Sequence, residues 1–184
     1  MFGGLRSHLK KRQRQEHAEA AGESTAFKSL VWLLKEPRDI NRDTLLILAR
    51  KALKDDLMDV VEAPADPELS GQMFLVTTNS GSGFAVISAH KPYADDPAAT
   101  TEDVDEQRRR HLFAEHKAWL AVDIIKGEDS PKTFEIMGKL MAELSGPDCL
   151  MLYSTTEQIL HPWHVELANA LRSPDPMGAL RSKR

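Results

Sequence analysis

The sequence has 184 residues, of which 41% are hydrophobic and 28% charged, and its formal net charge at pH 7 is −4. This length suits one domain, and the composition is typical of globular proteins, which excludes disordered, collagenous and membrane-spanning classes. With a pI of about 6.0, the chain has no overall positive field, so we do not expect it to bind nucleic acid.

Both ends of the chain lack the apolar residues that would offset the entropy of ordering. Residues 1–24 are basic between Arg6 and Arg14, and residues 173–184 contain two prolines and end in RSKR. We therefore predict flexible tails at 1–24 and 173–184 and a single domain at 25–172. No apolar run is long enough for a secretory signal or a transmembrane segment, so we expect a cytoplasmic protein.

Hydrophobic periodicity predicts alternating strands and helices in the domain. The sequence has strand-like runs at 30–34, 73–78, 84–90, 119–125 and 149–153. Between them we predict a helix from Asn41 to Leu53, a helix that begins at Thr100 or Thr101 and continues through the arginines at 108–110 to about His116, and a helix from Pro131 to Leu144. A capping-box sequence at 154–157 and a helix from Pro162 complete the order.

The first six elements follow the order β-α-β-β-α-β, which is that of a ferredoxin-like unit. The sequence therefore predicts an α+β fold, with a ferredoxin-like sheet of about five strands and helices mainly on one face. Two segments that begin LVWLL and AWLAV each give a tryptophan-bearing strand followed by an amphipathic helix. This parallel raises the hypothesis of a duplicated strand–helix unit.

Alternation along the strands suggests a mixed aromatic and polar sheet face. If the helices cover the aliphatic side, the other face would present a set of candidate binding residues. These are Trp32, Ser88, His90, Trp119 and Asp123. An open face of this kind suits a protein partner, a small ligand or a second copy of the chain.

Two groups of histidines are candidates for a metal or acid–base site. His161, His164 and Glu166 are ligand types for zinc, but Pro162 forces His161 into an extended conformation, unlike the HExxH motif. In the second group are His111, Glu115 and His116. His116 lies where a helix should end, which suits a structural role, although with His90 or Asp123 it would also form an acid–base or metal site.

No sequence motif for nucleophilic catalysis or for cofactor binding is recognisable. The loop 79–83 is followed by a strand and no lysine, unlike a phosphate-binding loop, and Cys149 lies in an apolar run that disfavours a thiolate. We therefore favour a non-enzymatic binding or regulatory module without a cofactor. The alternatives are a metal-dependent hydrolase and a basic tail that contacts nucleic acid or anionic lipid.

Three stretches of the chain resemble uncharacterised bacterial domain-of-unknown-function families: LVWLLKEPRDI, HKAWLAVDI and CLMLYSTTEQILHPW. The resemblance covers most of residues 28–170 and rests on the apolar pattern, His116, Trp119 and the segment 161–163. It implies a bacterial cytoplasmic origin and carries no activity over to this chain.

Overall fold

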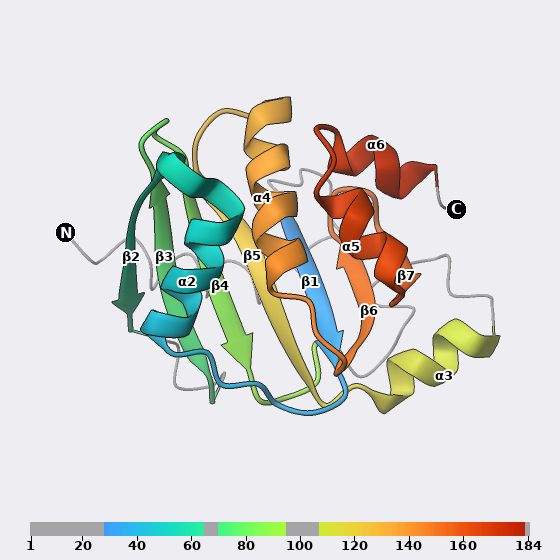
Figure 1. The fold of residues 1–184 in the computed structure, drawn as a ribbon. Coiled ribbons are helices and arrows are strands. Elements are labelled where there is room, and N and C mark those ends of the chain that lie inside the picture. The colour runs from blue at the N-terminus through green and yellow to red at the C-terminus, as the bar shows by residue number, and fades with distance from the viewer. Residues whose placement is uncertain (1–27, 65–69, 95–106, 183–184) are drawn as a thin grey trace, which may run out of the picture.

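A computed structural model describes residues 28–64, 70–94 and 107–182 of the chain. These residues form a mixed α+β structure around one seven-stranded sheet (Figure 1). The strands are β1 (Ser29–Leu34), β2 (Leu57–Ala63), β3 (Gln72–Thr78), β4 (Gly83–Ala89), β5 (Ala118–Lys126), β6 (Cys149–Ser154) and β7 (Ile159–Pro162). Their order across the sheet is β2-β3-β4-β5-β1-β6-β7, so the sheet is larger than the five strands predicted.

All neighbouring strands of the sheet are antiparallel. Because β5 and β6 both run antiparallel to β1, they are parallel to each other with β1 between them, and the helix α4 (Pro131–Glu143) connects them. The ferredoxin-like arrangement is not confirmed, since three strands and not two separate the first helix from the next. The duplicated strand–helix unit stays a prediction.

Among the described residues, four helices form a layer on one face of the sheet, as predicted, and one helix lies elsewhere (Figure 1). The layer consists of α2 (Arg42–Leu53), α4, α5 (Val165–Leu171) and α6 (Pro176–Arg181), and the short 3-10 turn η1 (Lys54–Asp56) follows α2. The helix α3 (Gln107–Glu115) buries Phe113 in the apolar cluster on the opposite face. No helix in the described ranges is long and apolar enough to cross a membrane.

The helix starts predicted at Asn41 and Pro131 are confirmed by their capping bonds. Asn41 Oδ1 accepts a hydrogen bond from the Thr44 backbone N–H at 2.8 Å, and Ser130 Oγ accepts one from Thr133 at 3.2 Å. Each bond satisfies a backbone donor that the first turn of a helix leaves without an internal partner. The first of these caps fixes where α2 begins.

The chain after Ser154 differs from the prediction. Residues 154–157 do not lead into a helix: Ser154 ends β6, residues 155–158 form a turn, and in the strand β7 that follows, His161 pairs with Leu152. Because Pro162 ends β7, α5 begins only at Val165. Beyond Ser173 the expected tail instead contains α6, with its Met177 and Leu180 side chains buried. The tail at 1–24 and the predicted helix residues 100–106 lie outside the described residues.

Gly138 marks a close contact between α4 and the C-terminal helices. A Cβ atom at this position would lie 2.4 Å from the Leu171 carbonyl oxygen and 2.9 Å from Pro176 Cβ. Both are far inside van der Waals distance, so only glycine lets the backbones approach this closely.

We expect Gly138→Ala to lower the free energy of unfolding by about 1–3 kcal/mol, because the new methyl group would push α4 away from α5 and α6. Helix propensity alone would make the alanine variant about 1 kcal/mol more stable. The sign of the change in unfolding free energy therefore distinguishes the steric clash from helix propensity. Urea unfolding measures the change. The exposed Lys132→Ala in the same helix is the control, and a Gly138→Ala protein more stable than wild type would contradict the interpretation.

Candidate functional site

The sheet separates the tryptophans that the sequence predicts on one face. In the β1–β5 pairing, Trp32 lies opposite Leu120, and directly opposed residues share a face. Trp32 therefore points into the helix layer, where its Nε1 donates a hydrogen bond to the Met141 carbonyl at 2.9 Å and its ring packs edge-on against Trp163. The prediction that Trp32 shares a face with Trp119 is wrong, because the pairing register, which sequence does not specify, aligns it with an aliphatic residue.

Trp119 and Asp123 lie on the other face of the sheet but are not open to solvent. Their exposed fractions are 4% and 5%. The Trp119 ring packs edge-on against Tyr93, with ring centroids 5.6 Å apart, and Tyr93 also contacts Tyr153. A small aromatic cluster therefore covers Trp119, and Asp123 is buried as well, so the face that we expected to be open is closed at these two residues.

Ser88 and His90, the polar residues that we also expected on that face, make their contacts in other parts of the structure. Ser88 Oγ accepts a hydrogen bond from the Gln72 backbone at 3.3 Å, and His90 Nε2 lies 3.0 Å from Asp39 Oδ1, at the approach to α2. Ser88 is two residues after Val86 in β4, so both side chains point to the same face, which is the helix side of the sheet. These two residues are therefore not brought together with Trp119.

His116 is buried after α3, and both of its ring nitrogens contact the backbone. Its Nε2 accepts a hydrogen bond from the Tyr93 N–H at 2.9 Å, and its Nδ1 bonds the Phe113 carbonyl oxygen. One nitrogen must accept while the other donates, which requires the neutral imidazole with its proton on Nδ1. His116 thus holds Tyr93 over Trp119, which is a structural role.

We expect His116→Phe to lower the free energy of unfolding by about 1–3 kcal/mol, because the Tyr93 N–H would lose its acceptor in a partly buried site. Urea unfolding followed by tryptophan fluorescence measures this. His111→Phe, at a side chain that is 74% exposed, is the matched control and should change stability by no more than about 0.5 kcal/mol. Equal effects of the two substitutions would contradict the role of His116.

The histidines proposed as metal ligands are distributed over several elements. His161 is buried in β7, whereas His164 and Glu166 are exposed at the start of α5, and His111 pairs with Glu115 at 2.9 Å on α3. Within the described ranges, no group of three His, Cys, Asp or Glu side chains could hold a metal ion. The metal-dependent hydrolase stays a prediction. Stoichiometric metal in protein purified without a histidine tag, lost on replacing His161 and His164, would support it.

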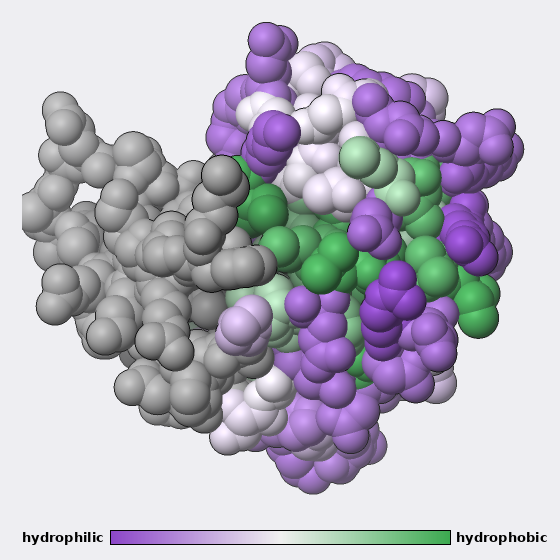
Figure 2. Space-filling model, turned by 90° about the vertical axis from the view of Figure 1, so that its left-hand side faces the viewer, coloured by the Kyte–Doolittle hydropathy of each residue, from purple (hydrophilic) through white to green (hydrophobic). Residues whose placement is uncertain are grey.

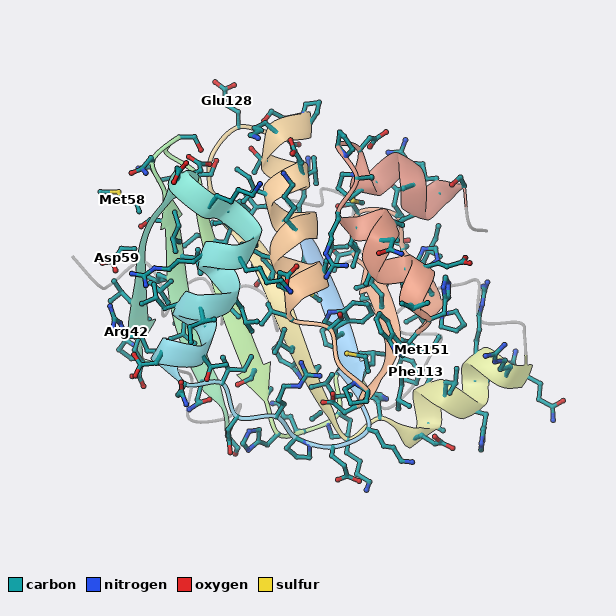
Figure 3. All side chains as sticks on the ribbon, in the orientation of Figure 1. Arg42, Met58, Asp59, Phe113, Glu128 and Met151 are labelled. Carbon is teal, nitrogen blue, oxygen red and sulfur yellow. The ribbon has the colours of Figure 1, made fainter. Side chains whose placement is uncertain are left out.

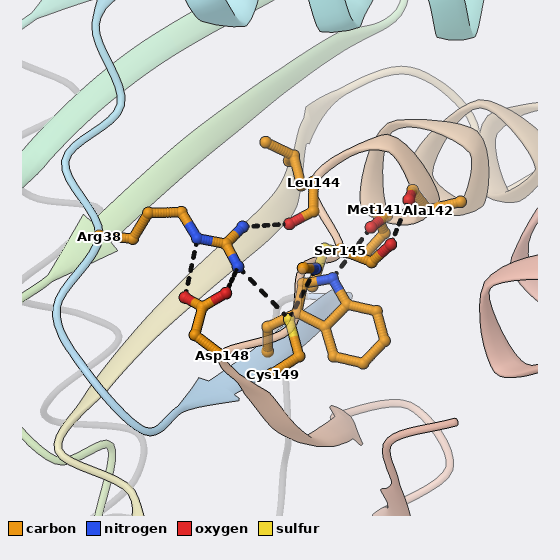
Figure 4. A network of polar contacts seen from close by, with 9 residues as sticks. Arg38, Met141, Ala142, Leu144, Ser145, Asp148 and Cys149 are labelled. Carbon is orange, nitrogen blue, oxygen red and sulfur yellow. Dashed lines mark hydrogen bonds and ion pairs between the residues drawn. The ribbon is translucent and has the colours of Figure 1, made fainter. Parts of the chain in front are cut away.

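Figure 4 shows a network of polar contacts between the end of α4 and the start of β6. The Arg38 guanidinium binds both carboxylate oxygens of Asp148, donates to the Leu144 carbonyl and lies 3.6 Å from Cys149 Sγ. A bidentate arginine–carboxylate pair fixes both geometry and distance. Because Arg38 precedes α2, the network ties three segments of the chain together.

The Cys149 thiol has low reactivity although it lies next to the Arg38 guanidinium. Burial raises the pKa of its thiol to about 11, and this outweighs the opposing effects of Arg38 and of the Gly146 N–H, which donates to Sγ at 3.3 Å. The thiol is therefore protonated at neutral pH, and a protonated thiol is a poor nucleophile. This agrees with the prediction from the sequence that the apolar run around Cys149 disfavours a thiolate.

We expect the stability advantage of wild type over Cys149→Ala to shrink as pH rises from about 9 to about 11. The unfolded thiol ionises near its ordinary pKa of 9.0, whereas the folded thiol keeps its proton until about 11. Its contribution is thus complete below pH 9.0 and is lost above it. Urea unfolding of both variants across this range measures the difference, and a difference independent of pH would contradict the burial argument.

Exposed apolar side chains concentrate at the β2 edge of the sheet. Within the described ranges four large apolar residues are exposed, and three of them lie on α2 and β2: Ile47 at 66%, Met58 at 69% and Val61 at 47%. Figure 2 shows hydrophobic atoms running in a band across this side of the molecule, between hydrophilic margins. Together with Arg42 and Asp59, these three residues are termed the α2/β2 surface.

The backbone of β2 is partly closed to strand pairing. The Val60 N–H donates to Asp59 Oδ1 at 2.7 Å, and the Val60 carbonyl accepts from Arg42 Nε at 2.8 Å. The pairing with β3 also shifts between Leu57 and Asp59, which leaves Met58 in a bulge. Figure 3 shows Met58 and Asp59 at the outer side of β2, with Arg42 near the start of α2. Bulges and charged residues are common on protected sheet edges.

Sequence reasoning missed this surface because it predicted no strand at 57–63. The segment LMDVVEA has apolar residues that do not alternate regularly, since the bulge at Met58 breaks the two-residue period. The available signal was the pair Val60-Val61 between Asp59 and Glu62, with Met58 directly before Asp59.

No protein-family model matches the chain, and no curated protein and no solved structure matches it either.

Proposed function

We propose that the protein is a non-enzymatic binding module that docks a protein partner on the α2/β2 surface. The observation that carries the proposal is the concentration of Ile47, Met58 and Val61 on two adjacent elements, while the other exposed large apolar residue of the described ranges, Val165, lies on α5. Single exposed apolar residues are ordinary, but a contiguous group with a polar rim is typical of interaction sites. A sheet edge also favours a protein over a small ligand, because small-ligand sites are concave.

The chemistry of the partner follows from Arg42. Its Nε bonds the Val60 carbonyl, but its terminal nitrogens lie 3.7 Å from Asp59 and 3.9 Å from Asp43, beyond hydrogen-bond distance. A half-exposed guanidinium of this kind can take a carboxylate in bidentate fashion. The partner that fits has apolar side chains next to a carboxylate.

We expect Met58→Cys to react with a maleimide much more slowly in intact cells than in dilute purified protein, because the partner covers it. Val165→Cys is the matched control, since the Val165 side chain is 72% exposed and Met58 is 69% exposed. Its labelling rate should not fall. The native Cys149 is buried and gives only a slow background. Equal labelling of the two introduced cysteines in cells would reject the α2/β2 surface as a docking site.

A further inference from the structure

Resting on the proposed function, we infer that the partner on the α2/β2 surface is a second copy of this chain. In this arrangement a two-fold axis passes through the surface, and Arg42 of each copy binds Asp59 of the other. The two residues carry opposite charges on one edge, and their side chains are 48% and 52% exposed. A surface that meets itself across a two-fold axis needs this kind of self-complementarity.

Within one chain Arg42 forms only long ion pairs, at 3.7 Å with Asp59 and at 3.9 Å with Asp43, and shares no hydrogen bond with either. Asp59 uses its Oδ1 to accept the Val60 N–H. In the dimer each guanidinium would gain a carboxylate in a setting from which Ile47 and Met58 of both copies exclude water. Removing water strengthens the attraction between the charges, so two such pairs would fix the relative orientation of the copies.

The contact between the copies is made by side chains and not by a continuous β-ladder. At the middle of β2, Val60 already has its outward N–H and carbonyl bonded by Asp59 and Arg42, and the bulge at Met58 interrupts the edge. Pairing of β2 with β2 would have to break both bonds. The surface therefore allows packing of Ile47, Met58 and Val61 while opposing open-ended strand addition.

The opposite edge of the sheet explains why the assembly should close as a dimer. The strand β7 has only four residues, ends at Pro162, and buries Ile159, Leu160 and His161. It offers no exposed apolar counterpart for a head-to-tail contact with β2. Since a patch that contacts itself forms a closed dimer, the chain should not extend into filaments.

Charge reversal tests the two-fold contact directly. We expect wild-type protein to sediment as a dimer, and Arg42→Glu and Asp59→Lys each to weaken dimerisation by about tenfold or more, because like charges would then face each other. A mixture of the two variants should restore the dimer. In the mixed dimer the introduced glutamate of one copy would meet the introduced lysine of the other, and the native pair would re-form at the second contact. The double variant should also dimerise. Lys132→Glu, at an exposed position of α4, is the charge control.

A second pair of variants covers the case in which changing Arg42 disturbs the fold through its bond to Val60. Ile47→Lys removes an exposed apolar residue and should weaken the dimer, whereas Val165→Lys should not. Circular dichroism and thermal unfolding check that each variant is folded.

A wild-type protein that is monomeric at all concentrations tested would overturn the second-copy inference, and so would a dimer that is unchanged in every variant. If Met58→Cys is nevertheless protected in cells, the docking surface stands and its occupant is a different protein. If Met58→Cys is labelled in cells as fast as Val165→Cys, the proposed function itself fails.

Discussion

The burial of β1 on both faces is the constraint on which the rest of the structure depends. Every residue from Leu30 to Leu34 has 0% exposure, and the strand is hydrogen-bonded to β5 on one side and β6 on the other. A strand buried in this way needs a layer on each face of the sheet. The helix layer covers Leu30, Trp32 and Leu34, and the opposite cluster receives Val31 and Leu33.

Because the centre of the sheet is covered on both faces, the polar side chains packed around it have structural roles. Trp32 bonds a helix carbonyl, His116 bonds two backbone groups, and the partly buried Arg38 binds Asp148 directly before β6. Each of these groups satisfies a buried polar atom that would otherwise destabilise the fold. Both faces of the sheet centre are thus occupied, and the proposed binding function lies at the periphery, where α2 and β2 expose apolar side chains.

The α2/β2 surface combines two opposing tendencies. Its apolar side chains favour association, while Arg42, Asp59 and the bulge at Met58 protect the strand edge from uncontrolled pairing. A side-chain interface reconciles them, because it buries the apolar residues without using the backbone of Val60. The same two charged residues that close the edge would then give the association its specificity.

Some elements of the fold could be predicted from the sequence because residues close together in the chain determine them. The caps at Asn41 and Ser130, the β3–β4 hairpin around the glycine-containing loop, and the strands at β1, β5 and β6 follow from side-chain chemistry and two-residue or helical periodicity. Tertiary structure alone decided the register that sends Trp32 away from Trp119, the burial of Asp123, and the edge position of β2. Strand pairing joins residues far apart in the chain, and no local pattern specifies which of them lie opposite each other.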